Sequence, residues 1–155
     1  MMFRRANRCD EKAVYDLSND PEIRKYSFNT KPILFNEHKD WFEKQLNDNE
    51  IIYFVAYDND NLVGQIRFKI MINEAIVSVS VSSSYRGKGH GVEMMHHALS
   101  FFKQSTMVFI VKAFIRADNF GSKQYFEKCG FRFVEHTIYS GIATDIYEIN
   151  VFDKR

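Results

Sequence analysis

A glycine-rich segment in the middle of the chain has the composition of an anion-binding loop. Three of the seven glycines stand at Gly87, Gly89 and Gly91, between a run typical of a β-strand and the apolar stripe of a helix. Glycine lets the main chain turn tightly, and the unpaired N–H groups at the start of a helix favour an anion. Arg86 and Lys88 add positive charge. The spacing predicts a loop that cradles a pyrophosphate, and a glycine-rich turn without a ligand is the alternative interpretation.

The order of residues in this loop differs from that of two known phosphate-binding motifs. A P-loop requires G-x-x-x-x-G-K-S/T, whereas Gly87-Lys88 is followed by Gly89, so no hydroxyl is placed for a magnesium ion. A dinucleotide fingerprint requires G-x-G-x-x-G in an early βαβ unit, whereas this stretch reads G-x-G-x-G after an antiparallel type of pattern. The sequence therefore excludes a nucleotide hydrolase of the P-loop type and ranks dinucleotide binding second.

The surrounding pattern predicts one mixed α/β (α+β) domain over residues 1–155. Alternation and apolar runs bounded by turn residues predict six strands, at residues 51–57, 62–70, 75–82, 107–115, 131–137 and 145–152. Apolar residues at helical spacing predict helices at residues 10–17, 22–26, 37–47, 91–103 and 118–129. Asn36 is expected to cap the third helix and Pro21 to start the second. Strand, loop, helix and strand around the glycines predict a parallel crossover.

Charge and composition exclude several classes of function. The 21 basic and 20 acidic residues leave a formal charge of +1, which provides no overall field for nucleic acid or an anionic membrane. No run approaches the roughly 18 apolar residues of a membrane span, and the first residues lack an apolar leader. Cys9 and Cys129 lack metal-ligand spacing and are expected as reduced thiols. We therefore expect a cytoplasmic protein without a metal, nucleic-acid or membrane partner.

Two motifs resemble those of the GNAT superfamily of N-acetyltransferases. The glycine loop is similar to the acetyl-coenzyme A (acetyl-CoA) signature R/Q-x-x-G-x-G/A, with Arg86, Gly89 and Gly91 at the signature positions. A second block is similar to N-x-x-A/S-x-x-x-Y/F-x-x-x-G-F, and its matching residues are Asn119, Ser122, Phe126, Gly130 and Phe131. Together with the predicted strands and the opening helices, the resemblance extends over nearly the whole chain.

This resemblance implies a fold and a cofactor site. A mostly antiparallel central sheet would carry helices on both faces, and its fourth and fifth strands would splay apart to admit pantetheine. The main chain of Val79 and Val81 would pair with the pantetheine arm like an added strand. The residues expected to bind the cosubstrate acetyl-CoA are Val79, Val81, Arg86, Gly87, Lys88, Gly89, His90, Gly91, Asn119 and Phe126.

The reaction implied is direct attack of a neutral primary amine on the thioester in a ternary complex, with no covalent enzyme intermediate. Many relatives use a tyrosine as the acid, but Phe126 stands at that position. Carboxylates that serve as the base in relatives are replaced by Phe114 and Ile76. Glu74 is a candidate base, acting through water, by strand alternation, and His38 and Glu22 are alternatives in the N-terminal helices that wall the acceptor site in this family.

The N-terminal residues resemble those of a subset of GNAT enzymes that act on 4-amino-sugar nucleotides in pseudaminic and other nonulosonic acid pathways. Glu22, Tyr26, Phe28 and Trp41 are then expected to bind this small-molecule amine, and core packing is the alternative role for the aromatic residues. Ribosomal-type protein N-terminal acetylation and polyamine acetylation stay open, as does a non-catalytic acetyl-CoA-binding or interaction module. Exposed strand edges would allow a homodimer.

Overall fold

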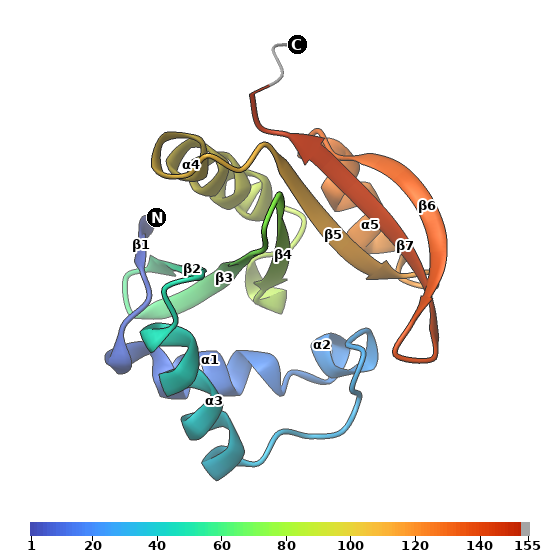
Figure 1. Ribbon diagram of the computed structural model, residues 1–155. Coiled ribbons are helices and arrows are strands. Elements are labelled where there is room, and N and C mark those ends of the chain that lie inside the picture. The colour runs from blue at the N-terminus through green and yellow to red at the C-terminus, as the bar shows by residue number, and fades with distance from the viewer. Residues whose placement is uncertain (153–155) are drawn as a thin grey trace.

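The computed structural model describes residues 1–152 and has a seven-stranded sheet at its centre (Figure 1). The strands follow the order β1-β2-β3-β4-β5-β7-β6, and every neighbouring pair is antiparallel except β4 and β5, which are parallel. Their bounds are β1 (Met2–Arg5), β2 (Ile51–Asp58), β3 (Asn61–Ile70), β4 (Glu74–Val81), β5 (Ile110–Arg116), β6 (Arg132–Tyr139) and β7 (Ile142–Asn150). The predicted mixed, mostly antiparallel sheet and its parallel crossover are confirmed.

Helices cover both faces of this sheet, as expected. They are α1 (Glu11–Ser18), α2 (Pro21–Lys25), α3 (Phe35–Asn47), α4 (His90–Ser105) and α5 (Phe120–Lys128), with 3-10 turns at Arg8–Asp10 and Ser83–Tyr85. One core holds α1 and α3 against β2 through Val14, Phe42 and Val55. The larger core packs α4 and α5 on the opposite face, where Met94 and Phe126 are buried. The central strands are packed between these two cores.

The strands β4 and β5 stay paired over only three residues. Their register joins Glu74–Ile76 to Ile110–Lys112, after which β4 pairs with β3 alone and β5 with β7 alone. The main chain of β4 beyond Ile76 therefore has a free edge that faces the gap. This divergence is the expected splay of the fourth and fifth strands.

The N-terminal segment differs from the sequence expectation in two places. A first strand, β1, pairs with the edge of β2, although no strand was predicted there. It is held by a bidentate ion pair from Arg4 to the buried Asp10, with both N–O distances 2.8 Å. The predicted cap Asn36 is wrong, because α3 begins at Phe35, two residues before the predicted start, and Leu34 occupies the cap position without a side-chain hydrogen bond. Pro21 starts α2 as predicted.

Two predicted strands have different limits. β5 begins at Ile110 rather than at residue 107, because Met107 is exposed and the carbonyl of Phe109 instead accepts from the N–H of Val151. β7 begins at Ile142, since Ser140 and Gly141 take positive φ and form a tight turn directly after β6. The predicted single domain over residues 1–155 includes three residues outside the described part, and it stays a prediction.

Candidate active site

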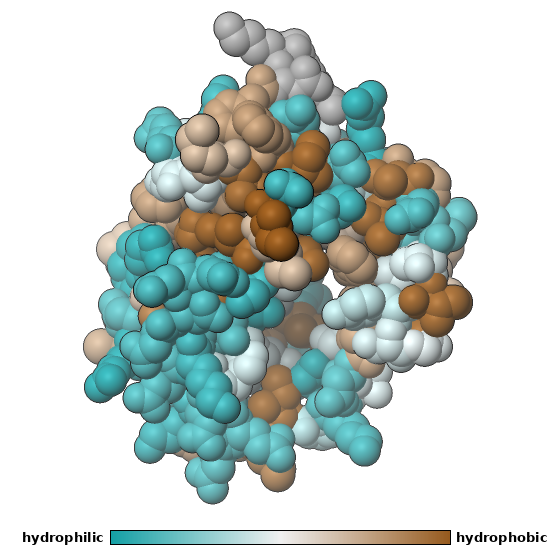
Figure 2. Space-filling model, in the orientation of Figure 1, coloured by the Kyte–Doolittle hydropathy of each residue, from teal (hydrophilic) through white to brown (hydrophobic). Residues whose placement is uncertain are grey.

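A cavity of about 1020 Å³ lies where β4 and β5 part. One wall comes from α2, α3 and the segment between them, and the other comes from β4, β5, the glycine loop and α5. The face in Figure 2 is hollowed between the N-terminal helices and the β6–β7 hairpin. We call the end at the glycine loop, where a pyrophosphate is expected, the phosphate end of the cavity. The end beneath α2 and α3, where the amine is expected, is called the acceptor end.

The phosphate end is an open loop of main chain. Gly87 and Gly89 have φ of +73° and +85°, a region that favours glycine, and a Cβ atom at either position would meet nothing within 4 Å. Gly89 is the N-cap of α4 and supplies no side chain to the first turn of that helix. Residues 1–152 provide no hydrogen-bond acceptor for the N–H groups of residues 87–91. These free amides fit a pyrophosphate at the positive end of the α4 dipole.

Gly91 is required for close packing at the same place. A Cβ atom there would lie 2.9 Å from Cε1 of Tyr125 and 3.2 Å from Cγ2 of Val81. The Tyr125 hydroxyl donates to the Gly91 carbonyl at 2.7 Å and so ties α5 to the start of α4. Burial raises the pKa of Tyr125 far above its usual value, so this phenol keeps its proton. The role of Tyr125 is to hold the loop in place.

The free edge of β4 presents main-chain groups to the cavity. The N–H of Ser82 donates to the carbonyl of Val63 on β3, so the alternate residues Val77, Val79 and Val81 direct their N–H and C=O groups away from β3. The carbonyl of Val81 accepts from Nε of Arg86 at 2.9 Å. An extended ligand arm could pair with Val79 and with the N–H of Val81, as the sequence predicted.

Of the three larger side chains of the loop, only that of Arg86 lines the cavity. Arg86 lines the cavity, and its Nη2 is 4.0 Å from a carboxylate oxygen of Asp20. Lys88 is not part of the lining, since its Nζ donates to the Ser84 carbonyl at 3.1 Å. His90 also lies outside the lining and packs edge-on against Tyr85, with ring centroids 5.4 Å apart. The side chains of Lys88 and His90 are therefore held outside the cavity.

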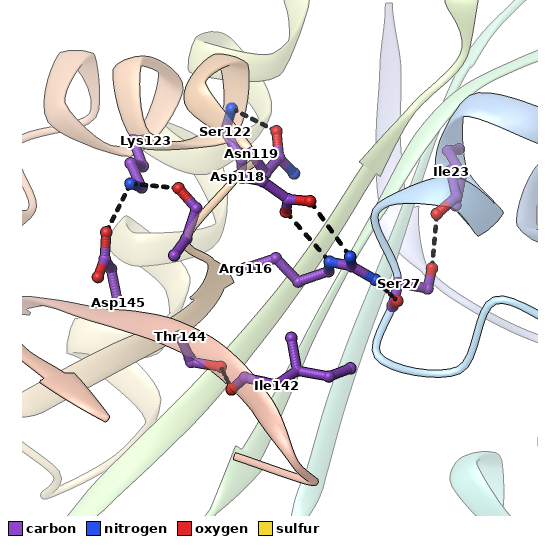
Figure 3. A network of polar contacts seen from close by, with 11 residues as sticks. Ile23, Ser27, Arg116, Asp118, Asn119, Ser122, Lys123, Ile142, Thr144 and Asp145 are labelled. Carbon is purple, nitrogen blue, oxygen red and sulfur yellow. Dashed lines mark hydrogen bonds and ion pairs between the residues drawn. The ribbon is translucent and has the colours of Figure 1, made fainter. Parts of the chain in front are cut away.

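Asn119 and Phe126 approach from α5, on the opposite wall. The side-chain oxygen of Asn119 caps α5 by accepting from the N–H of Ser122 at 3.1 Å (Figure 3), and its amide nitrogen is left for a ligand. Phe126 lines the cavity and packs in the core beside Phe131, with ring centroids 5.0 Å apart. It carries no ionisable hydroxyl, so the acid used by many relatives is missing at this position.

The acceptor end gathers residues that lie far apart in the sequence. Glu22, Tyr26, Phe28 and Trp41 all line the cavity. Phe28 contacts Tyr139 at the end of β6, with ring centroids 5.0 Å apart. Near the same edge, Arg116 on β5 donates to the carbonyl of Ser27 at 3.2 Å and pairs with Asp118, as Figure 3 shows. These contacts join the segment after α2 to the C-terminal strands and close the cavity at this side.

The three candidate bases have different surroundings, and Glu22 is exposed on the cavity wall. His38 is 2% exposed and lines the cavity, and its Nε2 lies 2.9 Å from the Glu11 carbonyl. Because a carbonyl only accepts, Nε2 carries the proton and Nδ1 keeps a lone pair, while burial lowers the pKa of the ring. Glu74 does not line the cavity, since it lies where β4 and β5 are still paired and forms an ion pair with Lys112 at 2.8 Å. This placement argues against Glu74 as the base.

The model of the acetyltransferase (GNAT) family matches residues 12–131 of the chain. The chain belongs to this family. The predictions of an N-acetyltransferase enzyme with acetyl-CoA as its cosubstrate are confirmed at the level of the GNAT family.

The relatives of this GNAT protein include enzymes named for spermidine and one whose name states no acceptor. Spermidine N(1)-acetyltransferase of Vibrio cholerae is 23% identical in an alignment 164 positions long, which covers 100% of this chain and 94% of the relative. Acetyltransferase PseH of Campylobacter jejuni is 24% identical over 117 residues, 76% of this chain and 73% of the relative. The crystal structure of the Vibrio cholerae spermidine N-acetyltransferase with CoA and spermine has a TM-score of 0.83 at 20% identity, covering 96% of this chain and 94% of its own.

Other structural features of this GNAT domain bear on partners. Residues 1–152 contain no cluster of three or more His, Cys, Asp or Glu side chains that could hold a metal ion. In the same residues no helix is long and apolar enough to cross a membrane. Cys129 is buried, and burial raises the pKa of its thiol to about 11, so it packs as a small apolar residue.

Several polar residues of the acceptor end were not expected from the sequence. Arg67 on β3 lines the cavity, with its guanidinium carbon 4.7 Å from the centre of the Trp41 ring. Gln65 and Glu37 also line it. The signal for Arg67 and Gln65 was present, because polar residues at alternate positions interrupt an apolar strand. Periodicity alone placed them on one face, but it did not show that this face borders a cavity.

Proposed function

We propose that this chain transfers the acetyl group of acetyl-CoA to a primary amine of a small molecule, which binds beneath α2 and α3. The observation that carries the proposal is the set of free N–H groups at residues 87–91, directly beside the free edge of β4. A pyrophosphate at the loop and an extended pantetheine arm along β4 would use both features at once. The thioester would then lie in the gap between β4 and β5, where the acceptor end begins.

The cofactor residues follow from this placement. The amides of Gly87 to Gly91 bind the pyrophosphate, and the Asn119 amide contacts the cofactor from α5. Val79 and Val81 supply main-chain groups to the pantetheine arm, and an N–H of this edge donates to the carbonyl oxygen that becomes an oxyanion. Acetyl-CoA supplies the activated acyl group. The protein contributes orientation and hydrogen bonds that strengthen as negative charge develops.

The chemical step balances without a covalent enzyme intermediate. The amine nitrogen attacks the thioester carbonyl, a C–N bond forms, and the C–S bond breaks with its electron pair leaving on sulfur. His38 is the group that we assign to accept the amine proton, directly or through water, because its Nδ1 lone pair and its lowered pKa keep it unprotonated. Phe126 has no proton to give, so the thiolate leaves as an anion toward the positive start of α4.

Two acceptor classes have support of different kinds. A 4-amino-sugar nucleotide is supported by the likeness of the N-terminal residues to the subset of GNAT enzymes that act on such sugars. A polyamine is supported by the spermidine N(1)-acetyltransferase relative and by Glu22 and Glu37, which are exposed on the cavity wall. Both classes supply the primary amine that the reaction requires, and they differ in the charge on the rest of the molecule.

A thiol-release assay tests the proposal. The protein is incubated with acetyl-CoA and either a nucleotide amino sugar, spermidine or a short peptide with a free N-terminus, and free CoA thiol is measured. Turnover of at least one amine above the rate without amine is expected, together with a rise of several degrees in Tm at saturating CoA, because ligand at about 100 times its Kd stabilises by about 2.7 kcal/mol. A rise in Tm without turnover of any amine would identify a non-catalytic binding module.

A further inference from the structure

Arg67 lies at the acceptor end without an anionic partner. Its guanidinium is enclosed between Trp41 and Tyr53, with the guanidinium carbon 4.7 and 5.8 Å from the two ring centres. The groups that contact its donors are neutral hydroxyls, that of Ser78 at a long 3.5 Å and that of Tyr53. No carboxylate among residues 1–152 forms an ion pair with Arg67, whereas Arg4 and Arg116 each hold an aspartate. An enclosed guanidinium normally has such a partner.

The cost of this arrangement indicates that something outside the chain completes it. Desolvation by burial lowers the pKa of Arg67, which shows that its surroundings disfavour the charge. The two aromatic rings offset part of this cost. A guanidinium has five N–H donors, so the two neutral hydroxyls leave donors available for an anion. A guanidinium whose position is fixed in this way can bind two oxygen atoms of one anion in a bidentate contact.

A second guanidinium at the same cavity has the same property. Arg24 on α2 lines the cavity, and one of its terminal nitrogens donates to the Asn29 carbonyl at 2.7 Å. Its Nε is buried and has no hydrogen-bond partner among the described residues. Two cations from separate elements, β3 and α2, therefore face one cavity without carboxylates of their own.

Arg67 is placed for the acceptor rather than for the cofactor. In the register of β3 and β4 it lies opposite Ser78, three residues before Val81 and the glycine loop. Ser78 alternates with Val77 and Val79, so it lies on the sheet face opposite the α4 core. The side of the sheet that carries Arg67 is the side covered by α3, where Trp41 and His38 also line the cavity.

We propose that Arg67, assisted by Arg24, binds an anionic group of the acceptor, so that the substrate is a primary amine that also carries a phosphate or a carboxylate. This inference rests on the proposed acetyl transfer and narrows it. A polyamine would place further positive charge beside two unpaired guanidinium groups, which costs binding energy. Glu22 and Glu37 lie on exposed parts of the wall and can attract the ammonium group as it enters.

Matched pairs of amines test the charge preference. Glucosamine 6-phosphate is compared with glucosamine, and β-alanine with β-alaninamide, while spermidine represents the cationic class. With thiol release as the readout, the anionic member of at least one pair is expected to have a kcat/KM about 10- to 100-fold higher than its neutral counterpart, as for a charge-assisted hydrogen bond in an enclosed site. The pair that shows the preference distinguishes phosphate from carboxylate. Equal or higher kcat/KM for neutral amines or spermidine would overturn the inference and leave acetyl transfer intact.

Variants of Arg67 assign the preference to this side chain. Arg67→Gln should reduce the anionic-to-neutral ratio of kcat/KM to about one, mainly through KM. Arg67→Lys should keep part of the ratio, because the charge remains while the planar fork is lost. Arg132→Gln is the matched control, since Arg132 is exposed on β6 and lies outside the cavity lining. An unchanged ratio in Arg67→Gln would contradict the assignment.

A binding measurement keeps the inference testable if no amine in the panel turns over. Trp41 is the only tryptophan of the chain and stacks on Arg67, so its fluorescence reports on this guanidinium. Protein saturated with CoA, which fills the phosphate end, is titrated with pyrophosphate and separately with glutarate. A saturable change in emission that Arg67→Gln abolishes supports the anion site even where acetyl transfer fails. No saturable change with either probe would overturn it.

Discussion

The phosphate end of the cavity is made of main chain, whereas the acceptor end is made of side chains. At the phosphate end, residues 79–91 supply a free strand edge and a run of free N–H groups from one continuous segment. At the acceptor end, α2, α3, β3 and β5 each contribute two or more lining residues, from Glu22 to Arg116. The first end depends on local conformation, and the second depends on how distant elements pack.

This difference determines what each end can tolerate. A main-chain site accepts most side chains as long as the backbone can adopt its dihedral angles, so its weak points are the glycines. A side-chain site can change specificity by single substitutions while the fold stays the same. Substitutions at the phosphate end should therefore weaken CoA binding whichever amine is the acceptor. Substitutions at the acceptor end should change the binding of the amine alone.

Gly89→Asp should give the largest effect. The aspartate introduces a negative charge and a side chain at φ of +85°, where the pyrophosphate would contact the loop. Loss of two charge-assisted hydrogen bonds, together with repulsion, is expected to weaken CoA binding about 1,000-fold. Isothermal titration with CoA measures this change.

Gly141→Asp is the matched control for that substitution. Gly141 also has a positive φ, +75°, with open space around its Cβ direction, but it lies in the β6–β7 turn outside the cavity lining. It should show a similar loss of stability from backbone strain with CoA affinity unchanged. Equal loss of CoA affinity in both variants would show that strain, and not the loop, causes the effect.

The same contrast explains how much the sequence could reveal. The loop was predictable because the glycines, their spacing and their place between strand and helix are local properties, and Gly87 and Gly89 take the positive φ that this requires. The splay of β4 and β5 followed from the family resemblance and not from periodicity. Strand β1 was missed because its pairing with β2 joins distant parts of the chain, and the ion pair from Arg4 to Asp10 is a side-chain contact that periodicity does not reveal.

Side-chain roles at the acceptor end were harder to predict for the same reason. Strand alternation put Glu74 on the face of Ser78, but the register between β4 and β5 places it beside Lys112, in the paired part of the strands. Arg67 carries no motif, and its importance comes from what surrounds it. The aromatic residues Tyr26, Phe28 and Trp41 were found because the family resemblance, and not their spacing, indicated which segment walls the acceptor.

His38 tests whether the acceptor end also supplies the base. A substitution that removes this base should lower kcat about 100-fold at neutral pH, which is the lower end of the usual rate contribution of general base catalysis. His38→Gln keeps a donor for the Glu11 carbonyl, whereas His38→Phe removes the donor and should also cost about 1 kcal/mol of stability. Low kcat in both variants supports the base, and full activity in His38→Gln would leave His38 a purely structural role.

The pH dependence of stability gives a second view of His38. Burial holds its pKa below the ordinary 6.5, so the folded protein binds fewer protons here than the unfolded chain. The contribution is complete above pH 6.5 and is lost as the pH falls toward the lower folded pKa. Urea unfolding at several pH values should therefore show a decrease in wild-type stability below pH 6.5 that is smaller in His38→Phe. An identical decrease in both proteins would show that other groups cause it.

Trp41→Leu should give the smallest effect and the sharpest separation of the two ends. The substitution removes the aromatic face under Arg67 and leaves the loop and the β4 edge untouched. A cation–π contact is worth about 0.5–2 kcal/mol, so KM for the acceptor should rise about 2- to 30-fold while the Kd of CoA stays within twofold. Phe101→Leu is the control, because Phe101 on α4 also lies against an arginine, Arg5, but outside the cavity lining. If Trp41→Leu weakened CoA as much as the acceptor, the two ends would be coupled through the sheet, and their independence would be refuted.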